Sequence, residues 1–374
     1  SNTLFYKSGT DDETDTTSKP IVQLQQELER EQRLIKAATI PWLQGQDSDN
    51  DNDAKKNVFL SHWNWQLDYF REHLTNLRVN EPSTTNGDDN LYCLDDGTKR
   101  MYTVSLSSDE YRDIRVTYMD FPSCQTFRCL AYPSDASLPI LGMGLMKFGK
   151  HQHLAVLDYQ PLTTSNININ INGDSQHNRN DAFSSELLRM RAEIPTMSQP
   201  HTYRHFVTEE RKYFTDYPLL GKYNNKKDKN NGSDNNNNND DDNDGVEAWF
   251  QELQRGQRDF VETHVRLTQG YSSERPTNDD SNDGRNSGID DDIDVVRIHS
   301  DFDTHVSRKE PAGPMLVATY GPEVAHRLVH EVIFPLSRNT HQATATATAT
   351  ATAEEQPVQS QQPSRSQTTE PQQQ

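Results

Sequence analysis

The chain has 374 residues, of which 32% are hydrophobic, and it carries a formal net charge of −20. This apolar share is low for a chain of that length, so part of the chain cannot belong to a packed core. The sequence has no apolar run long enough to span a membrane, and for a chain of this acidity we expect no nucleic-acid partner.

Four acidic stretches, at 11–15, 44–53, 224–245 and 278–294, carry most of the negative charge. Stretches such as "DKNNGSDNNNNNDDDNDG" cannot bury enough apolar surface to offset the entropy lost on ordering. We therefore expect one folded domain, at residues 57–337, with disordered insertions at about 224–245 and 272–294. Residues 1–56 are expected to be largely disordered apart from a helix at 21–38, and residues 338–374 to form a disordered low-complexity tail.

The middle of the chain predicts a β-sheet. Between Lys99 and Leu162 the hydrophobic period changes to that of strands, and five candidates follow one another: "RMYTVSLS", "YRDIRVTYMDF", "CQTFRCLAYP", "ILGMGLMKFG" and "HLAVLDYQPL". The connections between them are too short for crossover helices, so the strands should form an antiparallel meander.

Helical spacing occurs on both sides of these strands. The candidates are 21–38, 57–79, 182–193, 206–214, 246–269 and 314–334, the last broken or kinked at Gly321-Pro322. An antiparallel sheet with helices before and after it predicts an α/β fold, a three-layer α/β/α sandwich with a central antiparallel sheet.

Most catalytic and metal-binding signatures are missing. Gly142 and Gly144 lack the third glycine and the following helix of a dinucleotide fingerprint. Three cysteines cannot ligate an ordinary iron–sulfur cluster, and "HQH" at 151–153 has no third ligand nearby in sequence. We therefore predict no metal site, and Asp158 is assigned a structural role, hydrogen-bonding a turn.

Six blocks in order along the chain carry a family resemblance: "RDIRVTYMD", "QTFRCLAYP", "LPILGMGLMKFG", "LAVLDYQPL", "RKEPAGPMLVATYG" and "VIFPL". Together they resemble the ferredoxin-dependent bilin reductases, and among these most the enzymes that form phycoerythrobilin. The resemblance covers roughly residues 63–336. It implies an α/β/α sandwich that holds an open-chain tetrapyrrole between the sheet and the C-terminal helices.

The resemblance also implies the chemistry. Reduced ferredoxin is the external electron donor, no cofactor is bound, and the protein supplies the protons. The family's helix acid falls on Glu310 and its second polar pocket group on Arg128, whereas its hairpin aspartate falls on Gly144, which has no side chain. Val306 stands where some members have an arginine.

Candidate site residues follow from this correspondence. Catalytic roles are expected for Glu310 and for Asp120, which could take over the lost proton transfer, as could His151 or His153. The residues expected to bind substrate are Arg128, Arg115, Met143, Gly144, Met146 and Phe214.

The implied function is reduction of 15,16-dihydrobiliverdin to phycoerythrobilin. Two alternatives stay open: reduction of biliverdin to another bilin such as phytochromobilin, and a non-catalytic bilin carrier, which the loss of the acid at Gly144 favours. The expected partners are the bilin, ferredoxin and other bilin-biosynthesis enzymes, and the resemblance implies a plastid location.

Overall fold

A computed structural model describes residues 18–44, 57–80, 90–149, 152–162, 173–198, 213–224, 241–273, 287–308, 310 and 312–337 of the chain. Its centre is an antiparallel meander of β3 (Arg100–Ser107), β4 (Tyr111–Phe121), β5 (Cys124–Pro133), β6 (Ile140–Phe148) and β7 (Gln152–Gln160). These are the five strands expected from the sequence, and the meander is confirmed.

Three shorter strands extend the sheet. They are β1 (Arg78–Val79), β2 (Cys93–Asp95) and β8 (Leu219–Asn224). The order is β1-β3-β4-β5-β6-β7-β8, and β2 also pairs with β3, so that the described residues contain eight strands. The sequence did not predict these additions because each is too short to show an alternating pattern.

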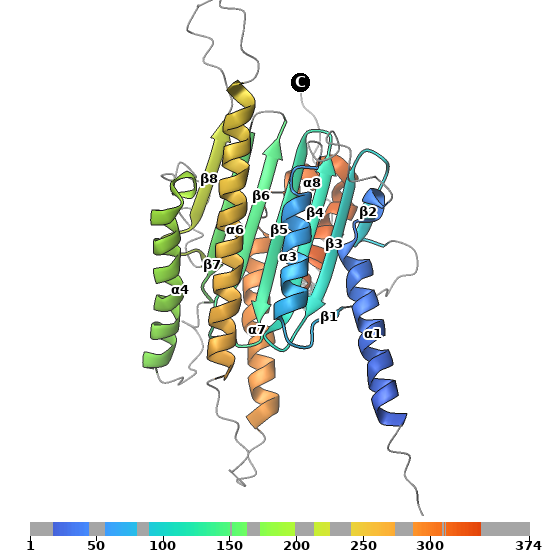
Figure 1. Cartoon of the computed structure of the whole chain (residues 1–374), viewed down its shortest axis with the longest axis vertical. Helices are drawn as coiled ribbons and strands as arrows, with labels where there is room; N and C mark the ends of the chain where they lie inside the picture. Colours follow the sequence, from blue (N-terminus) through green and yellow to red (C-terminus); the bar gives the residue numbers. More distant parts are fainter. Residues whose placement is uncertain are drawn as a thin grey trace, which may run out of the picture.

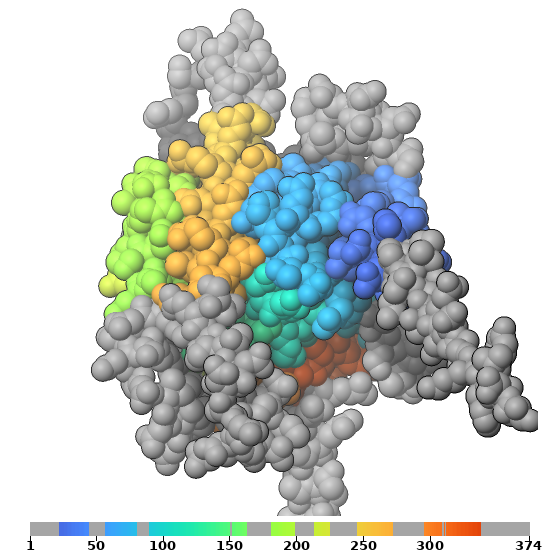
Figure 2. Space-filling view, turned by 60° about the horizontal axis from the view of Figure 1, so that its bottom comes forward, coloured from blue at the N-terminus to red at the C-terminus, as the bar shows by residue number. Residues whose placement is uncertain are grey.

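Helices from the N-terminal half and the centre of the chain cover one face of the sheet. They are α1 (Ser18–Ala38), α3 (Leu60–His73), α4 (Gly173–Glu193) and α6 (Asp241–Ser273), with single 3-10 turns at η1 (Pro41–Leu43) and η2 (Pro195–Met197). Figure 2 shows α4, α6, α3 and α1 side by side over this face. Their apolar side chains form one core cluster with the sheet.

Helix α3 shows how the sequence produces this packing. Trp63, Leu67 and Phe70 recur at helical spacing and are buried against the sheet. The helix ends at His73, earlier than the expected residue 79, and Asn76 has a positive φ of 53°. This left-handed residue turns the chain into β1.

The C-terminal elements cover the other face (Figure 1). They are α7 (Ser287–Ser307), α8 (Gly313–Tyr320), α9 (Pro322–Arg327), the π-helical turn η4 (Leu328–Ile333) and the 3-10 turn η5 (Pro335–Ser337). They form a second core cluster with the sheet. The expected break at Gly321-Pro322 is confirmed, and Gly321 adopts a φ of 84° that favours glycine. The three-layer α/β/α sandwich is therefore observed.

Several expected boundaries are corrected. Helix α6 begins at Asp241 and α7 begins at Ser287, so the insertions expected at 224–245 and 272–294 were drawn too wide. Helix α7 was missed because its first turns are rich in aspartate; its later turns bury Ile298 and Phe302. The expected domain start at residue 57 is also wrong, since Leu34 and Ile40 are buried in the first core cluster. Most of the helix expected at 206–214, and the tail from 338, lie outside the described residues.

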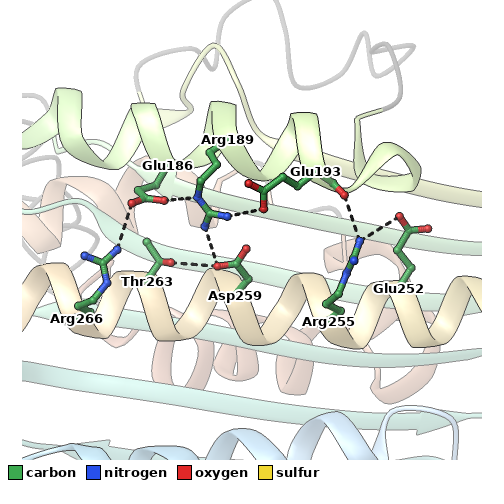
Figure 3. A network of polar contacts seen from close by, with 8 residues as sticks. All are labelled: Glu186, Arg189, Glu193, Glu252, Arg255, Asp259, Thr263 and Arg266. Carbon is green, nitrogen blue, oxygen red and sulfur yellow. Dashed lines mark hydrogen bonds and ion pairs between the residues drawn. The ribbon is translucent and has the colours of Figure 1, made fainter.

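An ion-pair network joins α4 to α6 (Figure 3). The Arg189 guanidinium of α4 lies 2.7 Å from Glu186, 2.7 Å from Glu193 and 2.8 Å from Asp259 of α6. Arg266 extends the network to Glu186 at 3.2 Å. Hydrogen bonds to carboxylates raise the pKa of Arg189. Because the side chain is partly exposed, solvent screening keeps the contribution of the network to stability small.

Candidate active site

One strip of the sheet face that looks toward the C-terminal helices is only half-buried. Strand pairing places Arg128, Gly144 and Val156 side by side on β5, β6 and β7. Val156 in turn pairs with Leu220 on β8, and Met146 follows Gly144 on the same face. All five are partly exposed, whereas Met143 and Leu145, which flank Gly144 on β6, are buried. The strip is therefore an apolar surface bordered by one guanidinium.

The C-terminal helices bring a carboxyl group to that guanidinium. Arg128 Nη1 donates a 2.7 Å hydrogen bond to Glu310 Oε2, and the other carboxylate oxygen of Glu310 accepts a 3.2 Å bond from the backbone N–H of Ala312. The Arg128 guanidinium also lies over the Phe334 ring, 4.9 Å from its centroid. The side chain of Glu310 is 6% exposed and that of Arg128 is 20% exposed. The two residues expected from the sequence thus form one partly buried ion pair.

Gly144 leaves space beside this pair. It lies directly opposite Arg128, and a Cβ built there would meet only the Met146 Cε methyl, at an ordinary 3.7 Å. Gly142, one pair further along β6, is different, because the Gln160 carboxamide covers it and a Cβ would come within 2.7 Å of Gln160 Cδ. Space for a ligand or a side chain therefore exists at Gly144 and not at Gly142.

Arg115 lies on the same face but is bonded within the protein. Its guanidinium forms an ion pair with Asp113, donates a 2.9 Å bond to the carbonyl of Ile333, and lies 5.4 Å from the centroid of the Tyr132 ring. These contacts fasten the η4 turn to the sheet. A role for Arg115 in binding substrate stays a prediction, and the structure supplies a structural role beside it.

Two buried carboxylic acids on this face were not assigned to the site from the sequence. Asp303 of α7 accepts a 2.7 Å bond from the Tyr132 hydroxyl and a 3.1 Å bond from the backbone N–H of Leu336, and burial raises its pKa to about 6. Asp158 of β7 accepts a 2.9 Å bond from the backbone N–H of Thr215 and a further bond from the hydroxyl of that residue. Burial raises the pKa of Asp158 to about 7. Complete burial causes these shifts, and the sequence held no signal for it.

Two expected site residues point away from the strip. Met143 belongs to the core cluster on the face of α3 and α6, because successive residues of a strand point to opposite faces. Asp120 likewise shares the face of Tyr118, and it accepts a 2.8 Å bond from Gln125 beside a hollow of about 460 Å³ at the end of the sheet. Both assignments are corrected, since neither side chain faces Glu310.

The remaining expected residues fall into three groups. Met146 lies on the half-buried strip, and Phe214 is half-buried on the segment that leads into β8. His153 is buried on the opposite face, where its ring packs 5.5 Å from that of Trp249. His151 lies outside the described residues.

Within the described ranges, no cluster of three histidine, cysteine, aspartate or glutamate side chains could hold a metal ion. None of the helices described has the length and apolar character needed to cross a membrane.

Comparison with known proteins gives a consistent result. The model of a protein family described as ferredoxin-dependent bilin reductase matches residues 95–335. A 15,16-dihydrobiliverdin:ferredoxin oxidoreductase from Nostoc punctiforme is 23% identical over 229 residues, which cover 61% of this chain and 75% of the relative. A protein of the same name from Parasynechococcus marenigrum is 25% identical over 231 residues, covering 61% and 79%.

Among solved structures, the chain is similar to phytochromobilin synthase from tomato in complex with biliverdin. The TM-score is 0.51 at 13% sequence identity, and the alignment covers 75% of this chain and 84% of the other. At this identity the likeness concerns the fold. The site residues described above lie within the segment that the family model matches.

Proposed function

The chain belongs to the ferredoxin-dependent bilin reductases, and we propose that within this family it reduces 15,16-dihydrobiliverdin to phycoerythrobilin. It is an oxidoreductase whose electrons come from reduced ferredoxin. The cyanobacterial relatives that carry the name of this reaction support the choice of substrate.

The Arg128–Glu310 pair beside the half-buried strip is the observation that carries the proposal. A bilin is broad, flat and largely apolar, so it suits a strip made of Gly144, Met146 and Val156. Its propionates are carboxylates, which a guanidinium binds through charge-assisted hydrogen bonds. Arg128 therefore offers the substrate an anchor at the edge of the strip.

Proton supply is the task left to the protein. Ferredoxin delivers electrons singly and brings no proton, so a side-chain acid must protonate the substrate as it is reduced. Glu310 is buried, and its cation partner is Arg128. If a substrate carboxylate engages Arg128, the Glu310 carboxyl group is released from its cation and stands beside the bound substrate. Substrate binding would then prepare the acid that the reaction needs.

Further parts of the proposal follow from family membership. The protein holds no flavin, nicotinamide or metal of its own, and its partners include other enzymes of bilin biosynthesis as well as ferredoxin. Its proposed location is the plastid. These statements extend the family's ferredoxin dependence and need their own tests.

A second candidate function is that of a bilin carrier without catalysis. Gly144 favours it, because the hairpin carries no carboxyl group opposite Arg128. A reductase that converts biliverdin to phytochromobilin is a further candidate, since it would use the same strip.

Purified protein, mixed with biliverdin or 15,16-dihydrobiliverdin, should shift and sharpen the long-wavelength absorption band of the bilin. Addition of reduced ferredoxin without oxygen should then convert the dihydrobiliverdin spectrum to that of phycoerythrobilin. Binding without conversion would leave the carrier function, conversion of biliverdin alone would favour the phytochromobilin reaction, and an unchanged spectrum at micromolar concentrations would exclude all three.

A further inference from the structure

The proposed reduction needs more than one proton. Saturating one double bond of the bilin adds two electrons and two protons, and two ferredoxins provide only the electrons. Glu310 is one carboxyl group at the strip, and Gly144 provides none. The source of the other proton is therefore an open question, and the following inference rests on the proposed function.

Asp158 lies on the same face of the sheet as the half-buried strip, diagonal to Gly144, the position without a side chain. Val156 pairs with Gly144, and Asp158 follows two residues later on the same face of β7, where it pairs with Gly142. In an antiparallel pair, such diagonal positions are about 7–8 Å apart. Gly144 has no side chain, so a ligand lying on the strip there comes within reach of β7, whereas Gly142 is covered by the Gln160 carboxamide.

A second residue of β7 also points to a ligand here. Gln160 follows Asp158 on the same face and is 7% exposed. Among the described residues its carboxamide oxygen has no hydrogen-bond donor. A buried acceptor without a partner is costly, and the pyrrole and lactam N–H groups of a bilin are donors that could satisfy it.

The environment of Asp158 suits a group that releases and regains a proton. Asp158 is 1% exposed. In the described part of the chain, its carboxyl group accepts hydrogen bonds from the backbone N–H and from the hydroxyl of Thr215. Burial is the main cause of its raised pKa, which hydrogen bonds from Thr215 and from the backbone of Tyr159 partly offset. Thr215 itself is half-buried, and its hydroxyl donates to Asp158 and accepts a 3.3 Å bond from the backbone N–H of the exposed Tyr217.

Within the described residues, few other titratable groups lie on the elements around Asp158, and the exposed Tyr217 is one of them. The segment that covers Asp158 contains Tyr213 and the exposed Asp216, and α7 contributes His305, whose ring lies 5.0 Å from that of Tyr213. The shift of the Asp158 pKa has no charged side chain among its causes. Its proton affinity is therefore set by burial and by hydrogen bonds, chiefly those from Thr215.

We propose that Asp158, connected to solvent through Thr215, supplies the second proton of the reduction. Each ferredoxin gives one electron, Glu310 and Asp158 give one proton each, and the bilin gains two hydrogens. Both carboxylates are then protonated again from solvent, Asp158 through the Thr215 hydroxyl. The protein is unchanged over the cycle.

Asp158→Asn tests the proposal, with Asp216→Asn as the matched control on an exposed position of the adjoining segment. The asparagine oxygen can still accept the Thr215 N–H bond, so the variant should bind bilin within about threefold of wild type. Reduction by ferredoxin should fall by roughly 100-fold or more, the size expected for loss of a proton donor. Asp216→Asn should turn over as wild type does. A rate for Asp158→Asn within threefold of wild type would overturn the proposal.

Thr215→Val keeps the backbone bond and removes the hydroxyl. The pH–rate profile of wild type should have an apparent pKa near neutrality, and Thr215→Val should lower the rate and move that apparent pKa; an unchanged profile would contradict the relay. If Asp158→Asn does not fold, Thr215→Val tests the proposal by itself.

Infrared difference spectroscopy separates failure of this inference from failure of the proposed function. The Asp158 band is the protonated-carboxyl signal that should disappear between pH 6 and pH 8 in wild type without bilin and be missing from Asp158→Asn, whereas the signal of Asp303, whose pKa is about 6, is common to both proteins and cancels between them. A wild type that shows this band and does not reduce any bilin would refute the reductase function alone. A wild type that reduces bilin and lacks the band would refute the role of Asp158.

Discussion

Arg128 and Glu310 stand 182 residues apart in the chain, and a 2.7 Å hydrogen bond joins Arg128 Nη1 to Glu310 Oε2. The bond connects the centre of the sheet to the turn before α8 at the edge of a half-buried apolar strip. The bond couples Glu310 to Arg128, so a substitution of either residue should affect the other.

Glu310→Gln should abolish most reduction while bilin binding persists. The amide keeps the shape and can still accept from Arg128, but it has no proton to transfer. We expect the rate to fall by roughly 100-fold or more. The measurement is single-turnover reduction without oxygen, with the exposed Glu323→Gln of α9 as the control. Wild-type turnover by Glu310→Gln would remove Glu310 from the mechanism.

Gly144→Asp tests why the hairpin acid is missing. A Cβ fits there, with the nearest heavy atom 3.7 Å away, and the new carboxylate would stand opposite Arg128. We expect a folded protein that reduces bilin faster or forms a different isomer, as judged from product absorbance. Gly144→Asn is the matched control without a proton donor. If both variants lose bilin binding, the glycine serves close approach of the ligand instead.

Asp158 should make stability depend on pH in a defined direction. Burial raises its pKa from the ordinary value of 3.8 to about 7. Between these two pKa values the unfolded chain has released the proton, whereas the folded chain retains it. The contribution of Asp158 to the free energy of unfolding is therefore largest below pH 4 and is lost as pH rises toward 7. The free energy of unfolding of Asp158→Asn, relative to that of wild type, should therefore rise by roughly 2–4 kcal/mol from pH 4.5 to pH 8. Denaturant unfolding at the two pH values measures this, and an equal difference at both would contradict it.

Electrostatic docking of ferredoxin should weaken with salt. Ferredoxins are acidic, and the sequence suggests Lys147, Lys150, Arg211 and Lys212 as their contacts, of which only Lys147 lies among the described residues. Lys147 is half-buried at the sheet end, and burial lowers its pKa. Turnover should decline as salt rises from about 50 to 500 mM, because screening shortens the reach of steering charges. Lys147→Gln should flatten this dependence, whereas a salt-independent wild-type rate would argue against such a face.

Deletion of residues 228–238 should leave folding and bilin binding unchanged. This stretch contains no apolar side chain and lies between β8, which ends at Asn224, and α6, which begins at Asp241. The wider deletion of 224–245 should be destabilising, because it removes the first turn of α6 and the end of β8. Melting curves of both variants with and without bilin test the contrast, and a lower melting temperature for the short deletion would contradict it.

The sequence alone determined the meander and the break in the C-terminal helices. Alternation over eight to eleven residues in β3 and β4 is a local signal, and Gly321-Pro322 ends a helix whatever surrounds it. The six ordered blocks also pointed to the family to which the chain belongs.

Only the tertiary structure decided which of these residues meet. Because strand side chains alternate in direction, the sequence placed Met143 beside Gly144 and Asp120 beside Met119, but packing of α3, α6 and the C-terminal helices determined which face each one joins. The burial that shifts the pKa of Asp158 comes from Thr215 and the segment around it, and no pattern within β7 encodes that cover. Proton affinity depends on how far water is excluded, and that is a property of the assembled layers.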